Sequence, residues 1–475
     1  MNSSDENAVL IIGGGPAGLT AAYELAKAGK RSIILEKEGI VGGISRTIKY
    51  KGYHFDIGGH RFFTKVERVN EMWREILGDD FIKRPRLSHV YYKRKFFNYP
   101  IKPFDVVLKL GFWESFLAGL SYVKAKVFKR KEEDSFEDYI VNNFGWRLYR
   151  TFFKSYTEKV WGIPCTKIKA SWAAQRIKGL SVTSLIRTAL FGNKDNEIKS
   201  LIEEFNYPKL GPGMMWEKTL EKALSTGLTK IYFNARPTRL SHKGGVVYEA
   251  TIATPQGEMT VPVSSVISSI PIAELFDLMS PAMSAEDLAA AHTLTFRDFI
   301  TVALILKRTD LFPDTWIYIH EPKVAVGRIQ NFNNWSPYMT PDNGTTCLGL
   351  EYFCFTTDAI WKKTDAELIE LASNEIEAIG LAKKEDVIDG AAARIEKTYP
   401  VYDDAYEAAM PTIHAAFAKL SNVYPVGRNG MHRYNNQDHA MLTAMLAVEN
   451  IQGANHNLWD VNVERVYHEE VKKHD

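Results

Sequence analysis

The sequence lacks the features that mark several specialised classes of protein. It has only three cysteines, Cys165, Cys347 and Cys354, none in CxxC spacing, so neither a disulfide framework nor a metal site is expected. The formal net charge of +2 gives no basic excess for binding nucleic acid. No apolar run reaches the roughly 18 residues of a membrane span, and the polar start MNSSDENAV is unlike a secretory signal. We therefore expect a cytoplasmic protein without metal or nucleic-acid partners.

A glycine-rich motif near the N-terminus is the clearest feature that is present. The segment GGGPAG, residues 13–18, follows the apolar run 9–12 and opens a helical pattern, and a second apolar run ends at Glu36. Such a turn lets the backbone approach a pyrophosphate at a helix N-terminus, and the carboxylate can bind both ribose hydroxyls. A dinucleotide site is therefore predicted. Its predicted contacts are Gly13, Gly15, Pro16, Ala17, Gly18, Glu36 and Lys37.

Paired glycines directly after Glu36 favour FAD over NAD as the dinucleotide. The segment 39–47 resembles the GG motif of flavoproteins of the amine oxidase and protoporphyrinogen oxidase type. Gly42 and Gly43 permit close approach of the backbone, and Arg46 can neutralise phosphate charge. FAD is the expected cofactor.

A segment near the C-terminus is predicted to return to the flavin. Gly427 and Arg428 lie in a loop before a helix that begins near Asn436, Gln437 and Asp438. A helix N-terminus aimed at the pyrimidine edge of the flavin would stabilise the negative charge that appears on reduction. An ordinary loop capped by Asn436 or Asp438 is the alternative.

The rest of the chain predicts an α/β protein built from several units. Helical patterns dominate residues 100–172, strand patterns follow at 230–270, and shorter runs at 301–355 predict a small antiparallel sheet. The expected fold is a Rossmann-like FAD-binding domain with an inserted helical domain and an antiparallel-sheet substrate domain. The predicted boundaries are 1–95, 226–295 and 396–475 for the three parts of the FAD-binding domain, 96–225 for the mainly helical substrate domain, and 296–395 for the sheet domain.

The basic, aromatic stretch 112–131 inside the helical part allows two interpretations. Such a helix could rest on anionic lipid. Burial against the neighbouring domain is the favoured interpretation, so membrane contact is not expected.

Several separated motifs, taken together, resemble the UDP-galactopyranose mutases over most of the chain. They are FDIGGH at 55–60, YTEKVWG at 156–162, WAAQR at 172–176, GRIQNFNNWSPY at 327–338, the Tyr-Pro pair at 399–400, and residues 428–439. The resemblance implies an enzyme that interconverts the pyranose and furanose forms of a nucleotide sugar, with N5 of the reduced flavin attacking the anomeric carbon and no net redox change. An external reductant such as NAD(P)H is compatible with that chemistry.

The resemblance also implies which residues are catalytic. His60, with Gly59 before it, would lie beside the isoalloxazine. Arg176 and Arg328 would hold the diphosphate, because a planar and always charged guanidinium suits it better than an ammonium group. A surface or ion-paired position is the alternative for either arginine.

Four aromatic residues are implied as further substrate contacts. Tyr99 and Trp161 would lie near the nucleoside, and Tyr399 and Tyr434 would bond to the phosphates and give the sugar an apolar face. Ordinary packing is the alternative for Trp161 and for the two C-terminal tyrosines. Residues 101–102, Ile and Lys, depart from the aromatic and glutamine that eukaryotic mutases place against uracil, so the nucleotide base stays open.

A second function is compatible with the same flavin site. An oxidoreductase of the amine oxidase, protoporphyrinogen oxidase or desaturase type would take a hydride from an apolar or amine substrate. Such an enzyme needs an aromatic or apolar cage in front of the flavin, whereas a nucleotide sugar needs convergent arginines. The pair of arginines, Arg176 and Arg328, should therefore discriminate between the two functions.

Overall fold

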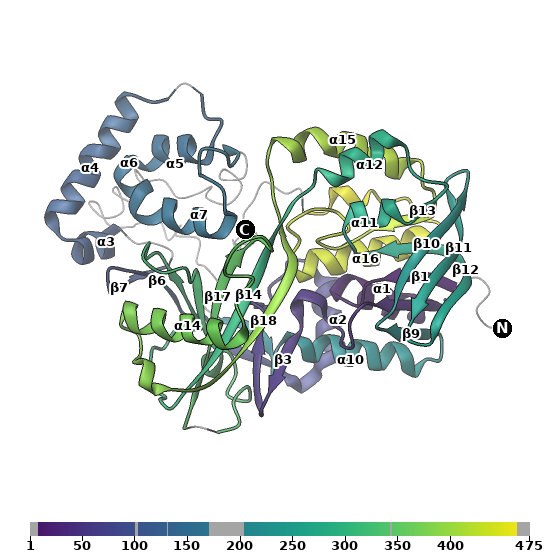
Figure 1. The fold of residues 1–475 in the computed structure, drawn as a ribbon, viewed down its shortest axis with the longest axis horizontal. Coiled ribbons are helices and arrows are strands. Elements are labelled where there is room, and N and C mark those ends of the chain that lie inside the picture. Colours follow the sequence, from purple (N-terminus) through teal and green to yellow (C-terminus); the bar gives the residue numbers. More distant parts are fainter. Residues whose placement is uncertain (1–7, 100–102, 131, 171–203, 343, 463–475) are drawn as a thin grey trace, which may run out of the picture.

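The computed structural model describes residues 8–99, 103–130, 132–170, 204–342 and 344–462. It has two lobes (Figure 1). One lobe is built around the strands next to the N-terminus and is covered by helices from both ends of the chain. The other lobe combines an antiparallel sheet with a group of helices. Among the described residues, none of the helices has both the length and the apolar character needed to cross a membrane.

The central strands of the first lobe confirm the predicted order of strand, turn, helix and strand. These elements are β1 (Ala8–Ile12), α1 (Pro16–Lys27) and β2 (Ser32–Glu36). Every residue of β1 and β2 is buried, as expected for central strands of a parallel sheet that is covered on both faces. The parallel neighbours are β12 (Gly257–Ser268) beside β1 and β9 (Thr229–Phe233) beside β2.

The strands predicted between residues 230 and 270 extend this same sheet. Its order is β13-β10-β11-β12-β1-β2-β9, and β19 also pairs with β12. The remaining strands are β10 (Arg236–Lys243), β11 (Val246–Thr254), β13 (Met279–Ser280) and β19 (Val423–Pro425). The helices of this part are α11 (Ile272–Asp277), α12 (Ala285–His292), α15 (Asp404–Ala418) and α16 (Gln437–Ile451).

The second lobe contains a seven-stranded sheet in the order β18-β14-β17-β16-β15-β6-β7. Its strands are β6 (Ser88–Tyr92), β7 (Lys95–Asn98), β14 (Phe296–Leu306), β15 (Trp316–Ile319), β16 (Arg328–Asn331), β17 (Thr346–Cys354) and β18 (Val387–Pro400). All pairings are antiparallel except that of β15 with β6. Helix α14 (Asp365–Ile379) packs against β14 and β18.

The predicted helical region is present, and a π-helical turn interrupts it. The elements are α3 (Pro103–Leu110), α4 (Phe112–Val127), α5 (Phe136–Phe144), α6 (Trp146–Leu148), the turn Tyr149–Lys154 and α7 (Ser155–Trp161). Ser135 starts α5 with a capping box, and Gly145 ends it at φ +82°, a conformation that favours glycine. These helices have a hydrophobic core of their own.

Segments between these units connect the two lobes. They are β3 (Thr47–Tyr50), β4 (Tyr53–Asp56), α2 (Glu67–Leu77), β5 (Phe81–Pro85), β8 (Glu204–Pro208), α10 (Pro212–Ser225) and α13 (Phe332–Trp335). Helix α10, which the sequence pattern attaches to the helical region, packs against α1 and α2 instead. Its apolar face carries Met215 and Trp216, which join the core of the nucleotide-binding lobe. Each lobe is therefore built around one sheet from several separate segments of the chain, not from one continuous range of residues.

Candidate flavin and substrate site

The turn between β1 and α1 has a geometry that only glycine permits. Gly13 has φ +103°, and a Cβ on Gly18 would lie 1.9 Å from the carbonyl oxygen of Gly13. Gly15 is the N-cap of α1 and Pro16 the first residue of the helix, so the first N–H groups of α1 face the turn without a side chain over them. This arrangement fits a diphosphate.

Glu36 lies beside this turn at the end of β2. Its buried carboxylate accepts the N–H of Gly14 at 2.8 Å and the N–H of Glu38 at 2.9 Å. Burial raises the pKa of Glu36, and the two N–H groups oppose that rise. The carboxylate is thus held in place at the position where a ribose would meet the turn, while Lys37 after it is exposed.

The paired glycines lie directly against the first turn. The N–H of Gly42 donates to the carbonyl oxygen of Gly14 at 2.9 Å, and a Cβ on Gly43 would lie 3.3 Å from the Cα of Gly15. Both paired glycines have positive φ, at +102° and +54°. Arg46 makes an ion pair with Glu38 through Nη1. The two glycine segments, separated by a helix and a strand in the sequence, therefore form one continuous backbone surface.

The C-terminal segment returns to the same place. Gly427 has φ +75°, and a Cβ on it would lie 3.1 Å from the Cβ of Ala17 at the start of α1. Helix α16 begins at Gln437, with Asn436 as its N-cap and a capping box to His439. Asp438 is buried in the first turn. Backbone approach at three glycine segments, a helix N-terminus and a fixed carboxylate together fit FAD.

Arg328 is the central cation of the second lobe. It lies on β16, makes an ion pair with the fully buried Glu351 of β17, and donates from Nη2 to the hydroxyl of Tyr399 at 3.1 Å. Gln330 holds the other oxygen of Glu351, at 2.6 Å. Burial alone would lower the pKa of Arg328, but Glu351 and the nearby phenols of Tyr399 and Tyr156 raise it well above its usual value. This guanidinium is therefore charged and fixed in direction.

A pair of stacked tyrosines joins this cation to the C-terminal segment. The rings of Tyr399 and Tyr434 are 5.6 Å apart and 16° from parallel. Arg428 lies over both rings, with Cζ 4.6 Å from the centroid of Tyr434 and 5.5 Å from that of Tyr399. Its Nε and Nη1 each donate to a backbone carbonyl at 3.0 Å. Ile44, from the paired-glycine segment, packs in the same cluster as the two tyrosines, so flavin and substrate motifs meet here.

His60 lies between the two arginines and the glycine loop. Its Nε2 donates to the carbonyl oxygen of Ile57 at 2.7 Å. Burial, together with the charges of Arg428 and Arg328, lowers the pKa of His60 to about 4, so the ring is neutral at pH 7. Gly59 fits closely over Gln330, whose Nε2 would lie 3.0 Å from an added Cβ.

An aromatic wall that the sequence did not single out continues the site toward the helical region. Tyr156 stacks on His320 with ring centroids 4.9 Å apart and 2° between the planes, and meets Tyr318 edge-on at 5.6 Å. Tyr99, a predicted contact, lies 4.9 Å from Tyr318. Arg61 lies over Trp316, which is two residues before Tyr318 on the same strand. The wall therefore adds aromatic surface near Arg328 and, over Trp316, a further cation.

The structure brings most, but not all, of the predicted substrate residues together. Trp161 is buried in the core of the helical region, where its ring is 6.4 Å from that of Tyr402, so it has the packing position that the sequence also allowed. Arg176 lies outside the described residues. A second arginine that contacts Tyr399 is Arg428, which was predicted to bind the cofactor.

Signals for the missed residues were present in the sequence. Trp316 and Tyr318 alternate along β15, a period of two that puts them on one face of the strand, and His320 follows directly after the strand with the same spacing. Glu351 is a carboxylate in the middle of the otherwise apolar strand β17, and such a residue is buried only with a partner. Neither pattern states which distant residue is the partner.

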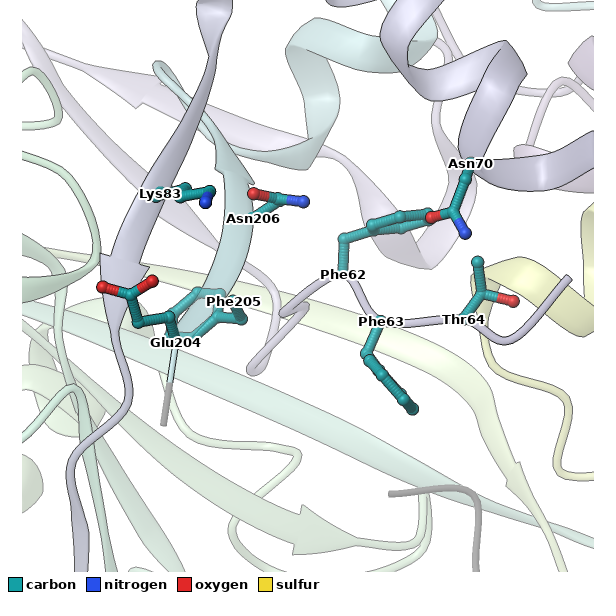
Figure 2. Close-up of a pocket in the computed structure, with 8 residues that line it drawn as sticks. All are labelled: Phe62, Phe63, Thr64, Asn70, Lys83, Glu204, Phe205 and Asn206. Atoms are coloured by element: carbon teal, nitrogen blue, oxygen red, sulfur yellow. The ribbon is translucent and has the colours of Figure 1, made fainter. Parts of the chain in front are cut away.

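A separate pocket of about 300 Å³ opens between the loop after His60, α2 and the antiparallel pair of β5 with β8 (Figure 2). Asn70 and Lys83 contribute polar groups, and phenylalanine rings form much of the wall in the figure. Its lining residues are Phe62, Phe63, Thr64, Asn70, Lys83, Glu204, Phe205 and Asn206. None of the predicted site residues lines this pocket, so it is distinct from the cleft at Arg328.

Comparisons of sequence identify the nucleotide-binding segment. The family described as NAD(P)-binding Rossmann-like domain matches residues 11–76. L-amino acid oxidase Cdc18 of Crotalus durissus cumanensis is 36% identical over 115 residues, which are 21% of this chain and 23% of the relative. A probable flavin-containing monoamine oxidase A of Dictyostelium discoideum is 45% identical over 82 residues, 17% of this chain and 18% of the relative. These matches thus span less than a quarter of the curated relatives.

Comparisons of structure extend over nearly the whole chain. A crystal structure of reduced UDP-galactopyranose mutase superposes with a TM-score of 0.82 and 22% identity, covering 96% of this chain and 98% of that one. A putative protoporphyrinogen oxidase from Exiguobacterium sp. 255-15 has a TM-score of 0.70 and 16% identity over 95% of this chain and 99% of that one.

Fold and site together define a flavoprotein with a Rossmann-like FAD-binding domain. More particularly, the chain has the fold shared by UDP-galactopyranose mutase and the protoporphyrinogen oxidase and putrescine oxidase structures. The predictions of this flavoprotein superfamily, of its α/β fold class and of FAD as cofactor are confirmed. The boundaries of the domains and the roles of individual residues stay predictions.

Proposed function

We propose that the protein is a flavin-dependent mutase that interconverts the pyranose and furanose forms of a nucleotide sugar. The observation that carries this proposal is the pair of fixed guanidiniums, Arg328 and Arg428, which both contact the Tyr399–Tyr434 pair. Glu351 already pairs with Arg328, whereas Arg428 bonds to neutral carbonyl oxygens, so a diphosphate would balance a charge that is otherwise costly to bury. An enzyme that takes a hydride from an apolar substrate, or from an amine without a carboxylate, would have no need of this charge.

The residues of the cleft bind and orient the substrate in this proposal. Arg328 faces the diphosphate with a direction that Glu351 fixes, and Arg176 stays the predicted second arginine for it. Burial raises the pKa of Tyr399 to about 12, so its hydroxyl is protonated and can donate to a phosphate oxygen while it accepts from Arg328. The faces of the tyrosines pack against the sugar ring.

The nucleoside end of the substrate lies toward the aromatic wall. Tyr99 and Tyr318 offer ring faces on which a base can stack. Residues 101–102 depart from the mutase pattern, and ring faces can stack on any base, so the identity of the base stays open.

FAD supplies a nucleophilic N5 when it is reduced, and an external donor such as NAD(P)H is the proposed source of electrons. The chain's contribution beside the flavin is a neutral His60 that donates from Nε2 to its own loop and so keeps that loop in a single conformation. A neutral ring at this place also adds no positive charge that would repel Arg328 and Arg428.

Anaerobic reduction followed by a panel of nucleotide sugars tests the proposal. The reduced protein is incubated with each sugar and sodium cyanoborohydride, and the released flavin is weighed by mass spectrometry, with the oxidised protein as the control. A flavin that has gained the mass of a hexose, together with a change of ring size detected by chromatography, is the expected result. If no sugar in the panel gives either signal, the mutase proposal is wrong.

A second candidate function rests on the N-terminal likeness to amine oxidases. In that case the oxidised protein would be bleached stoichiometrically by an amine or amino acid without any nucleotide. Arg328 could then hold the carboxylate of an amino acid. The two functions are separated by which redox state of the flavin reacts and by whether a diphosphate is required.

A further inference from the structure

An unusually large apolar surface lies on the outside of the helical region. Phe112 is 82% exposed, Trp113 65% and Val127 69%, although side chains of this kind are normally covered. The exposed apolar residues of this surface, which we call the α4 stripe, are Leu108, Phe112, Trp113, Phe116, Leu120, Val123, Val127 and Phe128. The expected burial of this segment against a neighbouring domain is therefore wrong for one of its faces.

Helix α4 has two apolar faces, and in the described part of the chain only one of them is buried. Ala118, Tyr122 and Ala125 are buried against the rest of the helical region. At about 100° per residue, the exposed members of the stripe on α4 fall within an arc of about 100° on the opposite side of the helix. The stripe is thus a second apolar face, not the edge of the buried one.

Lysines flank the stripe on both sides. By the same helical geometry, Lys124 and Lys126 lie just outside its two edges, about 160° apart, and both are exposed. Glu114, the acidic residue of α4, is engaged by a bidentate contact from Arg147. Lys129 and Arg130 follow the helix and are paired with Glu133 and with Glu137 and Asp138 respectively. The rim of the stripe on α4 therefore keeps a positive charge.

We propose that the α4 stripe rests on the surface of an anionic membrane. Aromatic and aliphatic side chains enter the boundary between headgroups and acyl chains, and flanking lysines extend to the phosphates, which is how interfacial helices bind. Figure 1 shows α4 along the outer edge of the helical region, on the side away from the nucleotide-binding lobe, where a flat surface can reach it. The contact is peripheral, since none of the described helices can cross a bilayer.

Charge favours a membrane over a second copy of the chain as the occupant. Two copies packed through their stripes would bring Lys124 and Lys126 of both molecules to one interface, where α4 offers no carboxylate other than the engaged Glu114. Anionic headgroups supply the complementary charge instead. Apolar burial and electrostatic attraction then act at the same surface.

Vesicle flotation with the full-length holoprotein tests this proposal. Vesicles of phosphatidylcholine alone are compared with vesicles that also contain phosphatidylglycerol. The protein should float with the anionic vesicles, and the variant Lys124→Glu/Lys126→Glu should lose at least about tenfold in partitioning. The variant Phe112→Ser/Trp113→Ser/Phe116→Ser should lose binding as well. Because these side chains are exposed, each variant should keep its bound FAD and its thermal stability.

Matched controls change the same residue types elsewhere on the surface. Lys243→Glu/Lys362→Glu makes the same change in charge at two exposed lysines outside the helical region, and Tyr248→Ser/Ile388→Ser removes exposed apolar side chains from other strands. Both controls should float like the native protein. Failure of the native protein to float, or equal loss in the controls, would overturn the proposal.

The oligomeric state and a fluorescence measurement complete the test. If sedimentation shows a native dimer that becomes a monomer in the triple Ser variant, the stripe is an interface between copies and the membrane proposal is wrong. Lipids brominated along the acyl chain should quench the native protein more than Trp113→Phe, because Trp113 is the tryptophan placed in the bilayer. Equal quenching of the two proteins would contradict the proposed orientation.

Discussion

The flavin turn and the arginine cleft achieve binding in opposite ways. At the turn, binding depends on the absence of side chains, because Gly13, Gly15 and Gly18 let the backbone, the helix and the ligand approach one another. At the cleft, the chain binds by directing side chains, and Arg328 needs Glu351 and Tyr399 from two other strands to hold its direction. A contiguous motif suffices for the first kind of site, whereas the second kind exists only once the whole sheet is formed.

The largest effect is expected at the turn. In Gly18→Ala, the new Cβ would lie 1.9 Å from the carbonyl oxygen of Gly13, so β1 and α1 must move apart. We expect loss of bound FAD and destabilisation by more than about 3 kcal/mol, measured by flavin absorbance and denaturant unfolding. Gly119→Ala is the control, because a Cβ there meets nothing within 4 Å. A yellow, stable Gly18→Ala protein would show that the turn tolerates side chains after all.

A smaller effect, which changes the reaction with the substrate but not FAD binding, is expected at the cleft around Arg328. Arg328→Lys keeps the charge but cannot bond to Glu351 and Tyr399 together. We expect kcat/KM for the nucleotide sugar that is turned over to fall about 100-fold, or about 2.7 kcal/mol, with FAD still bound. Arg308→Lys, at a half-exposed surface ion pair, should leave kcat/KM unchanged. If FAD is lost as well, the two sites are not separable in the way proposed here.

The cleft should also be the more acid-sensitive of the two regions. Burial, and to a smaller extent Lys159, lowers the pKa of His320 to about 3, so the folded protein binds fewer protons than the unfolded chain. Stability from this group is complete above about pH 6.5 and is lost as the pH falls toward the folded pKa. His320→Phe keeps the stack on Tyr156 and removes the titration. Between pH 7.5 and 5 it should lose about 2 kcal/mol less unfolding free energy than the native protein, while an equal loss would contradict the role given to His320.

The elements of the fold were predictable wherever the pattern was local. Helix α14 begins after Thr364, whose capping box gives a visible start signal, and it ends at a glycine with positive φ, so its bounds could be predicted. Helix α1 likewise begins where the pattern is local, since Pro16 stands in its first turn directly after the N-cap Gly15. The pairing of β15 with β6, from segments far apart in the chain, had no local signal.

The residues of the candidate site were also predictable only where their contacts are close in the sequence. Glu36 and the glycines follow from spacing alone, since their function depends on neighbours along the chain. Arg328 could be singled out only through a family resemblance, and the contacts of Glu351 and Tyr156 could not be found at all. Arg428 shows why such contacts have no local signal. It lies in a loop that the sequence assigns to the FAD-binding domain, yet its guanidinium lies over the rings of Tyr399 and Tyr434.

The smallest effect separates the two functions of a single side chain in the cleft. Tyr399 stacks on Tyr434 and also accepts from Arg328, so Tyr399→Phe removes the hydroxyl and leaves the stack. We expect KM to rise about tenfold or less, because one hydrogen bond to a charged group contributes about 1.5 kcal/mol, while stability and FAD binding stay unchanged. Tyr248→Phe, on an exposed strand, is the matched control. A fall in kcat at constant KM would mean instead that this hydroxyl acts on the reacting atoms, and that the cleft directs chemistry as well as binding.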